Sequence, residues 1–519
     1  MMSFLKSSEK NGNNKTIIWC CFMLCFLVQS VNAQDLTIST SGETGTSGTN
    51  WSISGNELTV TGTATVNVSV ITNHLETIGN LDVVANSSGS AQHIFIEGAI
   101  NFTGNVSRTL TFVARNDVKI NNSISSTNTS LHVIAKSGDN IEVSSTFSIV
   151  SNGGNIVLWA NTDGNNLGNI TVQPTSSIVS NGGGIWMGGG QTSAQWVPFD
   201  GATSITVGAA SAISGTAIPF GVVIRGTVNA GTGNFYAAGV SNKIGTDYST
   251  GVFFDANSSN IDIQAKNIKV IGQGSPNTGT AHSNRGVVVE IAANRIGTIQ
   301  ATAELYFEGT GSGTASTGSF NRGVHLLKNS AGTATITAST IYFKGTGAGA
   351  TGSNFNDGVS LLGITLGNSQ TTNIILEGRA GTFGTSTRAI NFQENVSIGN
   401  QSSSATIQFL GDSFTYNNSV IATQGSVGIL STSPSFSTAF SNTSLSITGS
   451  PSSIIIGRLN NTSNINIVNP LTVAGSIAIY GGNINVSENL NTTAGATAGN
   501  VLLKASGDVL LAASKSITT

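Results

Sequence analysis

Few residues in this sequence have a type and spacing that could carry out catalysis. Polysaccharide lyases and glycosidases need paired carboxylates, or an acidic cluster with a basic residue, converging on one face. Acidic residues are sparse here, although Asp255 and Glu290 occupy matching positions in neighbouring repeats. Arg285 and Arg322 match in the same way. We interpret the acids as a solvated ladder and the arginines as a repeated loop residue, so we expect no catalytic residues.

Metal and nucleotide sites are not indicated either. Five histidines are scattered without metal-ligand spacing. The polar stretch Asn161–Asn166 resembles a calcium loop, but it lacks the acidic residues and the terminal glutamate of that motif, so we interpret it as a turn. Gly347–Gly352 matches GxGxxG, yet a strand follows it, and no helix N-terminus is available to hold a phosphate. We therefore predict no metal and no cofactor.

Two tryptophans give one weak signal for binding. When the two IVSNGG units of the chain are aligned, Val157 matches Trp186, and Trp159 lies two residues further along. Both rings then project from the same face of neighbouring coils. On an outward face, Trp159 and Trp186 could stack against sugar rings. The alternative is that they pack under the long loop around Trp196.

The elements that would position these side chains follow from a repeat of about 35 residues. The repeat units begin at Gly251, Gly286, Gly323 and Gly358. Each unit opens with a Gly-Val strand, continues through a second strand, and ends in a third strand that closes on glycine. Apolar, often β-branched residues recur at period two, which is typical of strands. Three strands and a loop rich in Gly, Ser, Thr and Asn therefore form one predicted coil.

Alignment of the units assigns faces to the strands, because alternate residues of a strand point to opposite sides. The positions expected to point inward are Val252, Val287, Val324 and Val359, Phe254, Val289, Leu326 and Leu361, Ile263, Ile299 and Ile336, Ala265, Ala301 and Ala338, Ile268, Leu305, Ile341 and Ile374, and Val270, Phe307, Phe343 and Leu376. The positions expected to point outward are Phe253, Val288, His325 and Ser360, and Ile271, Glu308, Lys344 and Glu377. The last column places a lysine between two glutamates, with Tyr306 against Tyr342 nearby.

These columns predict the fold class. One coil cannot bury its apolar face alone, but coils stacked at a strand spacing of ~4.8 Å form continuous apolar ladders. We therefore predict an all-β fold, namely a parallel β-helix (solenoid) with three strands per coil. Further upstream, LTFVARNDVKI and LHVIAKSGDNIEV share one pattern, which aligns Leu110 with Leu131 and predicts shorter coils there.

Residues 1–33 have the features of a signal peptide. Three lysines precede the apolar run Ile17–Val31, and the small-residue site Val31–Ala33 precedes Gln34. All three cysteines lie in this segment, so the mature chain would have no disulfide. We therefore expect an exported protein that is stabilised by packing and hydrogen bonds.

The predicted organisation has five segments. They are the signal peptide (1–33), an N-terminal β segment or cap (34–79), a β-helix with short coils (80–250), a β-helix with repeats of about 35 residues (251–400), and a β-helix continuation that looks truncated (401–519). Because the sequence stops within what looks like another repeat, we expect it to be the N-terminal part of a longer surface protein. The net charge of −3 gives no indication of a nucleic-acid partner.

The GNI-strand-turn-strand units, with SIVSNGG and KASGDVLLAASKSITT, resemble the secreted filamentous-haemagglutinin-type adhesins of bacteria. The resemblance covers most of residues 80–519. It implies a shaft built as a right-handed parallel β-helix, in a protein that is secreted or held at the cell surface in association with the outer membrane.

The function that we expect is that of an adhesin-like structural scaffold. Its loops, such as Gly309–Asn321 and Gly345–Asn356, would present uncharged hydroxyl and amide groups to host or matrix glycans or to surface proteins. We expect no nucleic-acid partner, and a membrane association only through the signal peptide or a missing C-terminal anchor. Two alternatives stay open: a β-helical polysaccharide lyase or glycoside hydrolase, and an inert surface-layer spacer.

Overall fold

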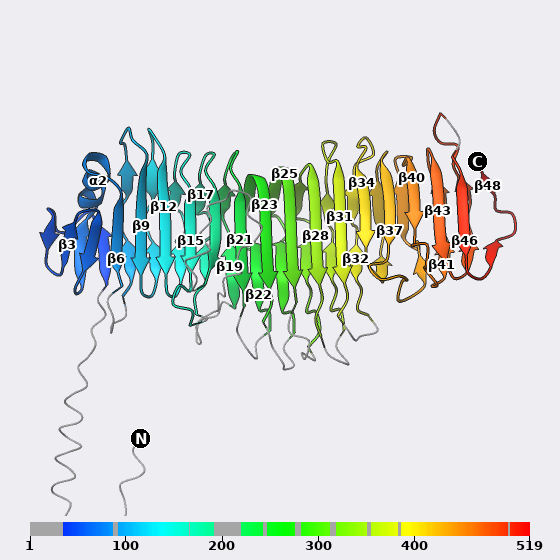
Figure 1. The fold of residues 1–519 in the computed structure, drawn as a ribbon, viewed down its shortest axis with the longest axis horizontal. Coiled ribbons are helices and arrows are strands. Elements are labelled where there is room, and N and C mark those ends of the chain that lie inside the picture. Colours follow the sequence, from blue (N-terminus) through cyan, green and yellow to red (C-terminus); the bar gives the residue numbers. More distant parts are fainter. Residues whose placement is uncertain are drawn as a thin grey trace, which may run out of the picture.

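The chain winds into an elongated stack of β coils. The computed structural model describes residues 35–86, 92–165, 167–190, 219–241, 247–275, 282–311, 318–349, 354–381, 386–496 and 499–519. Within these residues nearly every regular element is a strand, and almost all strand pairs are parallel. The first coils lie at one end of the stack and the last coil lies at the other (Figure 1). The prediction of an all-β solenoid with parallel sheets is confirmed.

Three ladders of strands run along the stack, one for each strand of a coil. The first ladder contains β5 (Ala64–Asn67), β1 (Leu36–Ser39), β7 (Ile94–Ile96), β10 (Val118–Ile120), β13 (Ile141–Val143), β16 (Ile170–Val172), β19 (Phe220–Ile224), β22 (Thr250–Ala256), β24 (Arg285–Ile291), β26 (Val324–Lys328), β29 (Val359–Leu362), β32 (Ile390–Glu394) and β35 (Phe414–Tyr416). After a break, β38 (Phe440–Ser441), β41 (Ile465–Ile467), β44 (Ile484–Val486) and β47 (Val509–Leu511) continue it in a separate sheet.

The second ladder contains β8 (Ile100–Phe102), β11 (Ile124–Ser126), β14 (Ser148–Val150), β17 (Ser177–Val179), β20 (Thr227–Asn229), β23 (Ile261–Gln273), β25 (Ile296–Thr310), β27 (Thr333–Thr337), β30 (Thr365–Leu366), β33 (Ser397–Gly399), β36 (Ser419–Ala422) and β39 (Leu445–Thr448). Beyond these strands, β42 (Leu471–Thr472), β45 (Leu490–Asn491) and β48 (Ile517–Thr518) form a small sheet of their own.

The third ladder contains β4 (Glu57–Val60), β6 (Leu81–Ala85), β9 (Arg108–Ala114), β12 (Leu131–Ser137), β15 (Ile156–Ala160), β18 (Ile185–Gly189), β21 (Phe235–Val240), the second halves of β23 and β25, β28 (Thr340–Thr346), β31 (Asn373–Arg379), β34 (Thr406–Leu410), β37 (Ser426–Leu430), β40 (Ser453–Ile456), β43 (Ser476–Gly481) and β46 (Val501–Ala505). In the middle coils β23 and β25 supply both the second and the third strand, and their pairing shifts between Ala265 and Asn267.

The core is a set of apolar columns inside the three ladders. The predicted register is confirmed in the middle coils: Val252 pairs with Val287, which pairs with Val324, and this order continues to Val359. All of the residues predicted to point inward are buried, in one continuous cluster that extends along the stack. Phe307 shows how tightly the columns pack, because its ring stacks on that of Phe343 with centroids 5.0 Å apart.

The outward column of the first ladder is buried as well, which differs from our expectation. Phe253 and Val288 form a second apolar cluster with Val223, separate from the main core. His325 and Ser360, in the same column, are also buried. The alternation of faces is therefore correct, but the outer face of this sheet is not open to solvent at these four positions in the middle coils.

The predicted alignment of Leu110 with Leu131 is wrong by two residues. In the structure Leu131 pairs with Arg108, and Leu110 pairs with Val133. A shift of two residues keeps every side chain on the same face, since the period of a strand is two. The apolar pattern alone therefore cannot distinguish the two registers.

One helix interrupts the β structure near the N-terminal end. Helix α2 (Val68–Thr77) follows β5, and the Asn67 side chain accepts a hydrogen bond from the Ser69 N–H at 2.9 Å, as an N-cap does. Its sequence is rich in β-branched residues, which we included in a β segment. Burial of residues such as Ile71 and Leu75 outweighs this weak strand preference.

Near α2, β3 (Trp51–Ser54) forms antiparallel pairs with β2 (Ser47–Gly48) and β4. The N-terminal end of the stack thus departs from the parallel coil.

Asparagine side chains hold the turns of neighbouring coils together. The Asn284 N–H donates to Asn321 Oδ1 at 2.9 Å, and the Asn321 N–H donates to Asn356 Oδ1 at 2.8 Å. The Asn356 N–H in turn donates to Thr387 Oγ1 at 3.3 Å. All three asparagines are fully buried, so these bonds satisfy backbone groups that the turn removes from the ladders.

Replacement of Phe307 by alanine should open a cavity in the core of β25. Because Phe307 is fully buried between the rings of Phe254 and Phe343, we expect a loss of about 3–5 kcal/mol. Native-state hydrogen exchange of the β25 amides measures this loss as a lower free energy of opening. The control Gln300→Ala, at an exposed site of the same strand, should change it by less than about 0.5 kcal/mol. Equal effects of the two variants would contradict the packing described here.

Candidate functional site

The structure brings the two predicted tryptophans together but buries them. Val157 pairs with Trp186, as predicted, and the rings of Trp159 and Trp186 meet edge to face with centroids 5.4 Å apart. The exposed fractions of the two residues are 2% and 1%. Trp159 Nε1 also donates a hydrogen bond to the Gly190 carbonyl at 2.9 Å. This arrangement favours the packing alternative over a sugar platform, although Trp196 lies outside the described residues.

The matching acids and arginines are more buried than the expected solvated ladder. Asp255 and Glu290 pair in register, as predicted, but Asp255 is buried and lies 2.7 Å from Arg225 Nε. Arg322 is buried too. Its Nε lies 3.3 Å from Asp357 Oδ2, in an ion pair without hydrogen-bond geometry. The interpretation as a solvated ladder is therefore wrong for Asp255. Arg285 and Arg322 recur on neighbouring coils, as a repeated loop residue does, although Arg322 is buried.

The matching arginines belong to one column of residues, which continues over two more coils than the repeat alignment indicated. Backbone bonds link Gly286 to the Arg322 carbonyl, Gly323 to the Asp357 carbonyl and Gly358 to the Arg388 carbonyl. Arg285, Arg322, Asp357 and Arg388 therefore follow one another on successive coils. We call these four residues the charged column; it holds three arginines and one carboxylate.

The buried part of the charged column is positively charged and tightly held. Burial and the neighbouring Arg322 lower the pKa of Arg285 to about 10. Arg285 Nε is buried and makes no hydrogen bond to the residues that the structure describes. His325 lies against Arg322, with Nε2 3.0 Å from Arg322 Nη1. Burial, followed by the two arginines, lowers the pKa of His325 well below 6.5, so the ring is neutral at pH 7.

Two exposed phenylalanines lie beside the charged column. The rings of Phe320 and Phe355 stack with centroids 5.0 Å apart and planes 6° apart, and each residue is more than a third exposed. The Arg322 guanidinium lies 5.3 Å from the centre of the Phe320 ring. Both phenylalanines have positive φ, 65° and 56°, which is unfavourable for a bulky side chain and costs on the order of 1–2 kcal/mol each. A strained, exposed aromatic pair is a feature of functional sites.

The turns that carry these residues join each third strand to the next first strand, along the lower edge in Figure 1. We call this the loop edge. Its described residues in the middle coils are 274–275, 282–284, 311, 318–321, 347–349, 354–356, 380–381 and 386–388. The loops that we expected to present polar groups, Gly309–Asn321 and Gly345–Asn356, belong to it; residues 312–317 and 350–353 of these loops lie outside the described residues.

A cavity of about 670 Å³ opens on the loop edge, one coil beyond Phe355. It lies at the break in the first ladder, where β35 and the next first strand, β38, belong to different sheets. The residues that line it are Gly378, Arg379, Ala380, Gly381, Thr387, Arg388, Ala389, Asp412, Ser413, Thr432, Ser433, Ser437 and Thr438. The Gly381 N–H donates to the Asn356 carbonyl at 3.0 Å, which joins the cavity wall to the turn that holds Phe355.

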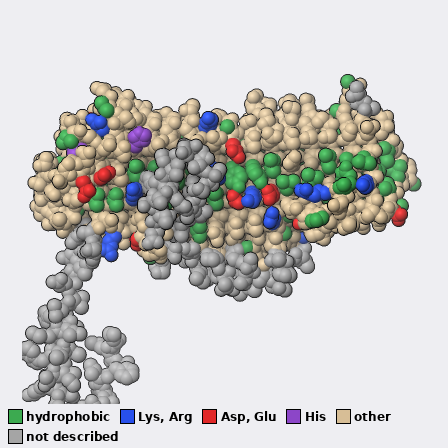
Figure 2. Space-filling model, viewed as in Figure 1, with side chains coloured by type: hydrophobic (Ala, Val, Ile, Leu, Met, Phe, Trp, Pro, Cys, Tyr) green, Lys and Arg blue, Asp and Glu red, His purple; other side chains and the backbone are tan. Residues whose placement is uncertain are grey.

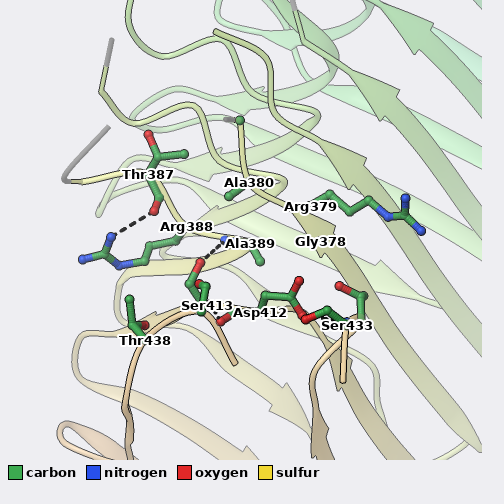
Figure 3. Close-up of a pocket in the computed structure, with 13 residues that line it drawn as sticks. Gly378, Arg379, Ala380, Thr387, Arg388, Ala389, Asp412, Ser413, Ser433 and Thr438 are labelled. Carbon is green, nitrogen blue, oxygen red and sulfur yellow. Dashed lines mark hydrogen bonds between the residues drawn. The ribbon is translucent and has the colours of Figure 1, made fainter. Parts of the chain in front are cut away.

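Two arginines flank the cavity (Figure 3). Arg388 is fixed, since its Nε donates to Thr415 Oγ1 at 2.8 Å and its Nη1 donates to the Thr387 carbonyl at 2.9 Å. Arg379 is exposed, and its guanidinium makes no hydrogen bond to any residue that the structure describes. The two side chains extend in opposite directions, and Asp412 and Ser413 lie between them.

The rest of the lining is mostly hydroxyl and backbone. Asp412 Oδ1 accepts a hydrogen bond from the Ser433 N–H at 2.9 Å, and Ser413 Oγ accepts one from the Ala389 N–H at 3.0 Å. Asp412 is the one carboxylate among the lining residues. Glycoside hydrolysis normally needs two carboxylates, so this lining is suited to binding an anionic or hydroxylated ligand.

Sequence reasoning missed Arg379, Arg388, Asp412 and the phenylalanine pair. A signal for the pair was present, because SFNRGV and NFNDGV place Phe320 and Phe355 at the same position before their Gly-Val strands. Arg388 continues that alignment through STRAI. The cavity had no such signal, because it depends on the end of a ladder rather than on a repeated residue.

Other candidate features add no second site. No group of three or more His, Cys, Asp or Glu side chains that could hold a metal lies among the residues placed by the structure. On the outer face of the third ladder, Lys344 Nζ lies 2.8 Å from Glu308 Oε1 and the rings of Tyr306 and Tyr342 meet at 5.2 Å, as predicted. Figure 2 shows charged side chains gathered near the middle of its face, with a hydrophobic band extending toward the C-terminal end.

Comparisons with known proteins identify no relative. No family model, no curated protein and no solved structure matches the chain. In the described part of the chain, no helix is long and apolar enough to cross a membrane.

Acid should destabilise the fold partly through His325. The folded protein keeps this ring neutral, whereas the unfolded chain takes up a proton as the pH falls below 6.5, so acid favours the unfolded state. We expect the fall in Tm between pH 7.5 and pH 5 to be smaller in His325→Gln than in the wild type. His282→Gln makes the same change at an exposed histidine and serves as the control for the substitution itself. If both variants followed the wild-type curve, the neutral state of His325 would be refuted.

Proposed function

We propose that this protein is an exported, adhesin-like scaffold that holds a ligand-binding loop edge on a rigid shaft. The observation that carries the proposal is the uninterrupted third ladder, which pairs strand to strand from β4 to β46. Each strand is bonded to the coil before it and the coil after it, so the stack resists bending and local opening. Such a stack keeps a binding edge at a fixed distance from a surface.

Two finer features belong to the proposal. The coils are right-handed, because connections between parallel strands of one sheet are right-handed in about 98% of cases. Residues 1–33 direct export and are removed before Gln34, because a positively charged start, an apolar run and a small-residue site follow one another.

The loop edge favours a binding scaffold over the two alternatives. A polysaccharide-active enzyme would need a second carboxylate near Asp412, and the lining residues of the cavity offer arginines and hydroxyls instead. In an inert spacer, nothing would offset the backbone strain of the exposed pair of Phe320 and Phe355. We therefore propose glycans or surface proteins of a host or matrix as partners, as in the adhesins that the sequence resembles.

Export can be tested by expression of the full chain in a Gram-negative bacterium. We expect the periplasmic or secreted product to begin at Gln34, because Ala33 is small enough for signal peptidase, and intact-mass spectrometry measures this directly. Ala33→Arg should block cleavage and leave the longer chain. A cytoplasmic product that retains residues 1–33 would contradict the export proposal.

Adhesion can be tested with beads coated with residues 34–519. We expect the beads to remain on at least one of three surfaces after washing, namely epithelial cells, plant cell wall and bacterial biofilm matrix, and microscopy counts them. Albumin-coated beads are the control. Retention no greater than that of albumin on all three surfaces would favour the spacer, and release of sugar products from the surfaces would favour the enzyme.

A further inference from the structure

We propose that the loop edge binds an extended acidic oligosaccharide, with sugar rings against Phe320 and Phe355 and sugar carboxylates on Arg388 and Arg379. This inference deepens the proposed function and rests on it, because it names the class of ligand that the scaffold would hold.

The phenylalanine pair supplies apolar contact for a sugar. Phe320 and Phe355 lie on neighbouring coils, and their exposed ring surfaces form a small apolar step in an edge that is otherwise polar. The apolar C–H faces of a pyranose pack on aromatic rings in this way, whereas its hydroxyls stay in water. The positive φ angles show that the turn holds both rings outward despite the strain in the backbone.

The charged column favours an anion over a neutral ligand. The column's three arginines, Arg285, Arg322 and Arg388, share one carboxylate within it, Asp357, and the Glu290 carboxylate also acts on Arg285. Three arginines against these two carboxylates leave an excess of positive charge along the loop edge. A ligand carboxylate is the group that a guanidinium binds best, through two parallel N–H···O bonds.

The arrangement of the groups indicates an extended ligand. Phe320, Phe355 and Arg388 lie on three successive coils, and strands of neighbouring coils are ~4.8 Å apart. This spacing is close to the length of one sugar residue in a polymer. Arg379 and Arg388 extend in opposite directions from the cavity, so they suit carboxylates on different sugars.

The cavity has the size and lining for one end of such a chain. Its volume of about 670 Å³ falls within the range of small-molecule sites, about 300–1,000 Å³. Thr387, Ser433 and Thr438 offer hydroxyls that can exchange hydrogen bonds with sugar hydroxyls. The chain's net charge of −3 argues against nucleic acid, whose binding depends on many neutralised phosphates.

The test is isothermal titration calorimetry of residues 34–519 with tetragalacturonate and with tetramannuronate. We expect at least one of them to bind, and its methyl ester, which lacks the charge, to bind at least about tenfold more weakly. Binding should weaken as salt is raised, because the arginines are at the surface.

Three variants locate the site. Arg379→Gln and Phe355→Ala should each weaken binding about tenfold, because each removes one exposed contact group. Lys266→Gln is the matched control, since Lys266 is an exposed cation at the bend between the second and third strands, away from the loop edge, and it should bind as the wild type does. Circular dichroism and Tm check that each variant folds.

Several results would overturn the inference. They are no binding of either oligosaccharide at millimolar concentration, equal binding of the methyl esters, equal weakening by Lys266→Gln, or tighter binding of single-stranded DNA of the same charge. If one of these results were obtained and the coated beads were still retained, the acidic ligand would be refuted but the adhesive scaffold would stand. If the beads were not retained either, the proposed function would be refuted as well.

Discussion

The structure depends on one constraint: each coil can bury its apolar columns only against the coils on either side of it. Parallel hydrogen bonds between coils fix the distance at which the columns meet, and the inward side chains then fill the space that remains. Phe307 and Phe343 illustrate this, because the backbone spacing places their rings in a stack. Packing and hydrogen bonding thus select the same register, and the fold needs no disulfide.

The same constraint explains the turns. At a turn, backbone N–H groups no longer bond to a neighbouring strand. Side chains of the adjacent coil accept hydrogen bonds from these groups instead. The buried side chains of Asn321 and Asn356 do this in sequence, since each accepts a hydrogen bond from the backbone N–H of the matching asparagine one coil earlier. Since Asn321 and Asn356 are held in place by these bonds, the preceding residues Phe320 and Phe355 are held outward, even though each must adopt positive φ. The loop edge is therefore rigid at the point where it is most exposed.

Much of the fold could be predicted because residues at the same position of successive repeats lie next to each other on neighbouring coils. Val252, Val287 and Val324 occupy one column in the sequence alignment and one ladder in the structure. Prediction failed for features that the repeat alignment does not determine. The alternation of a strand cannot detect a two-residue shift such as that at Leu110, and the burial of Phe253 depends on what covers the outer face of its sheet. Helix α2 forms through tertiary packing, and the cavity beside Arg379 forms where a ladder stops. A single unrepeated site leaves no pattern to align.

The stacking of coils is tested most directly by a distance between spin labels on one outer column. Asp82 and Gln408 lie at the two ends of a run of paired residues on the third ladder, separated by ten strand steps. Because residues 34–519 contain no cysteine, Asp82→Cys and Gln408→Cys can be labelled selectively in the mature chain. Double electron–electron resonance should give one narrow distance near 48 Å, from ~4.8 Å per step. A broad distribution, or a distance far from this value, would contradict a single continuous solenoid.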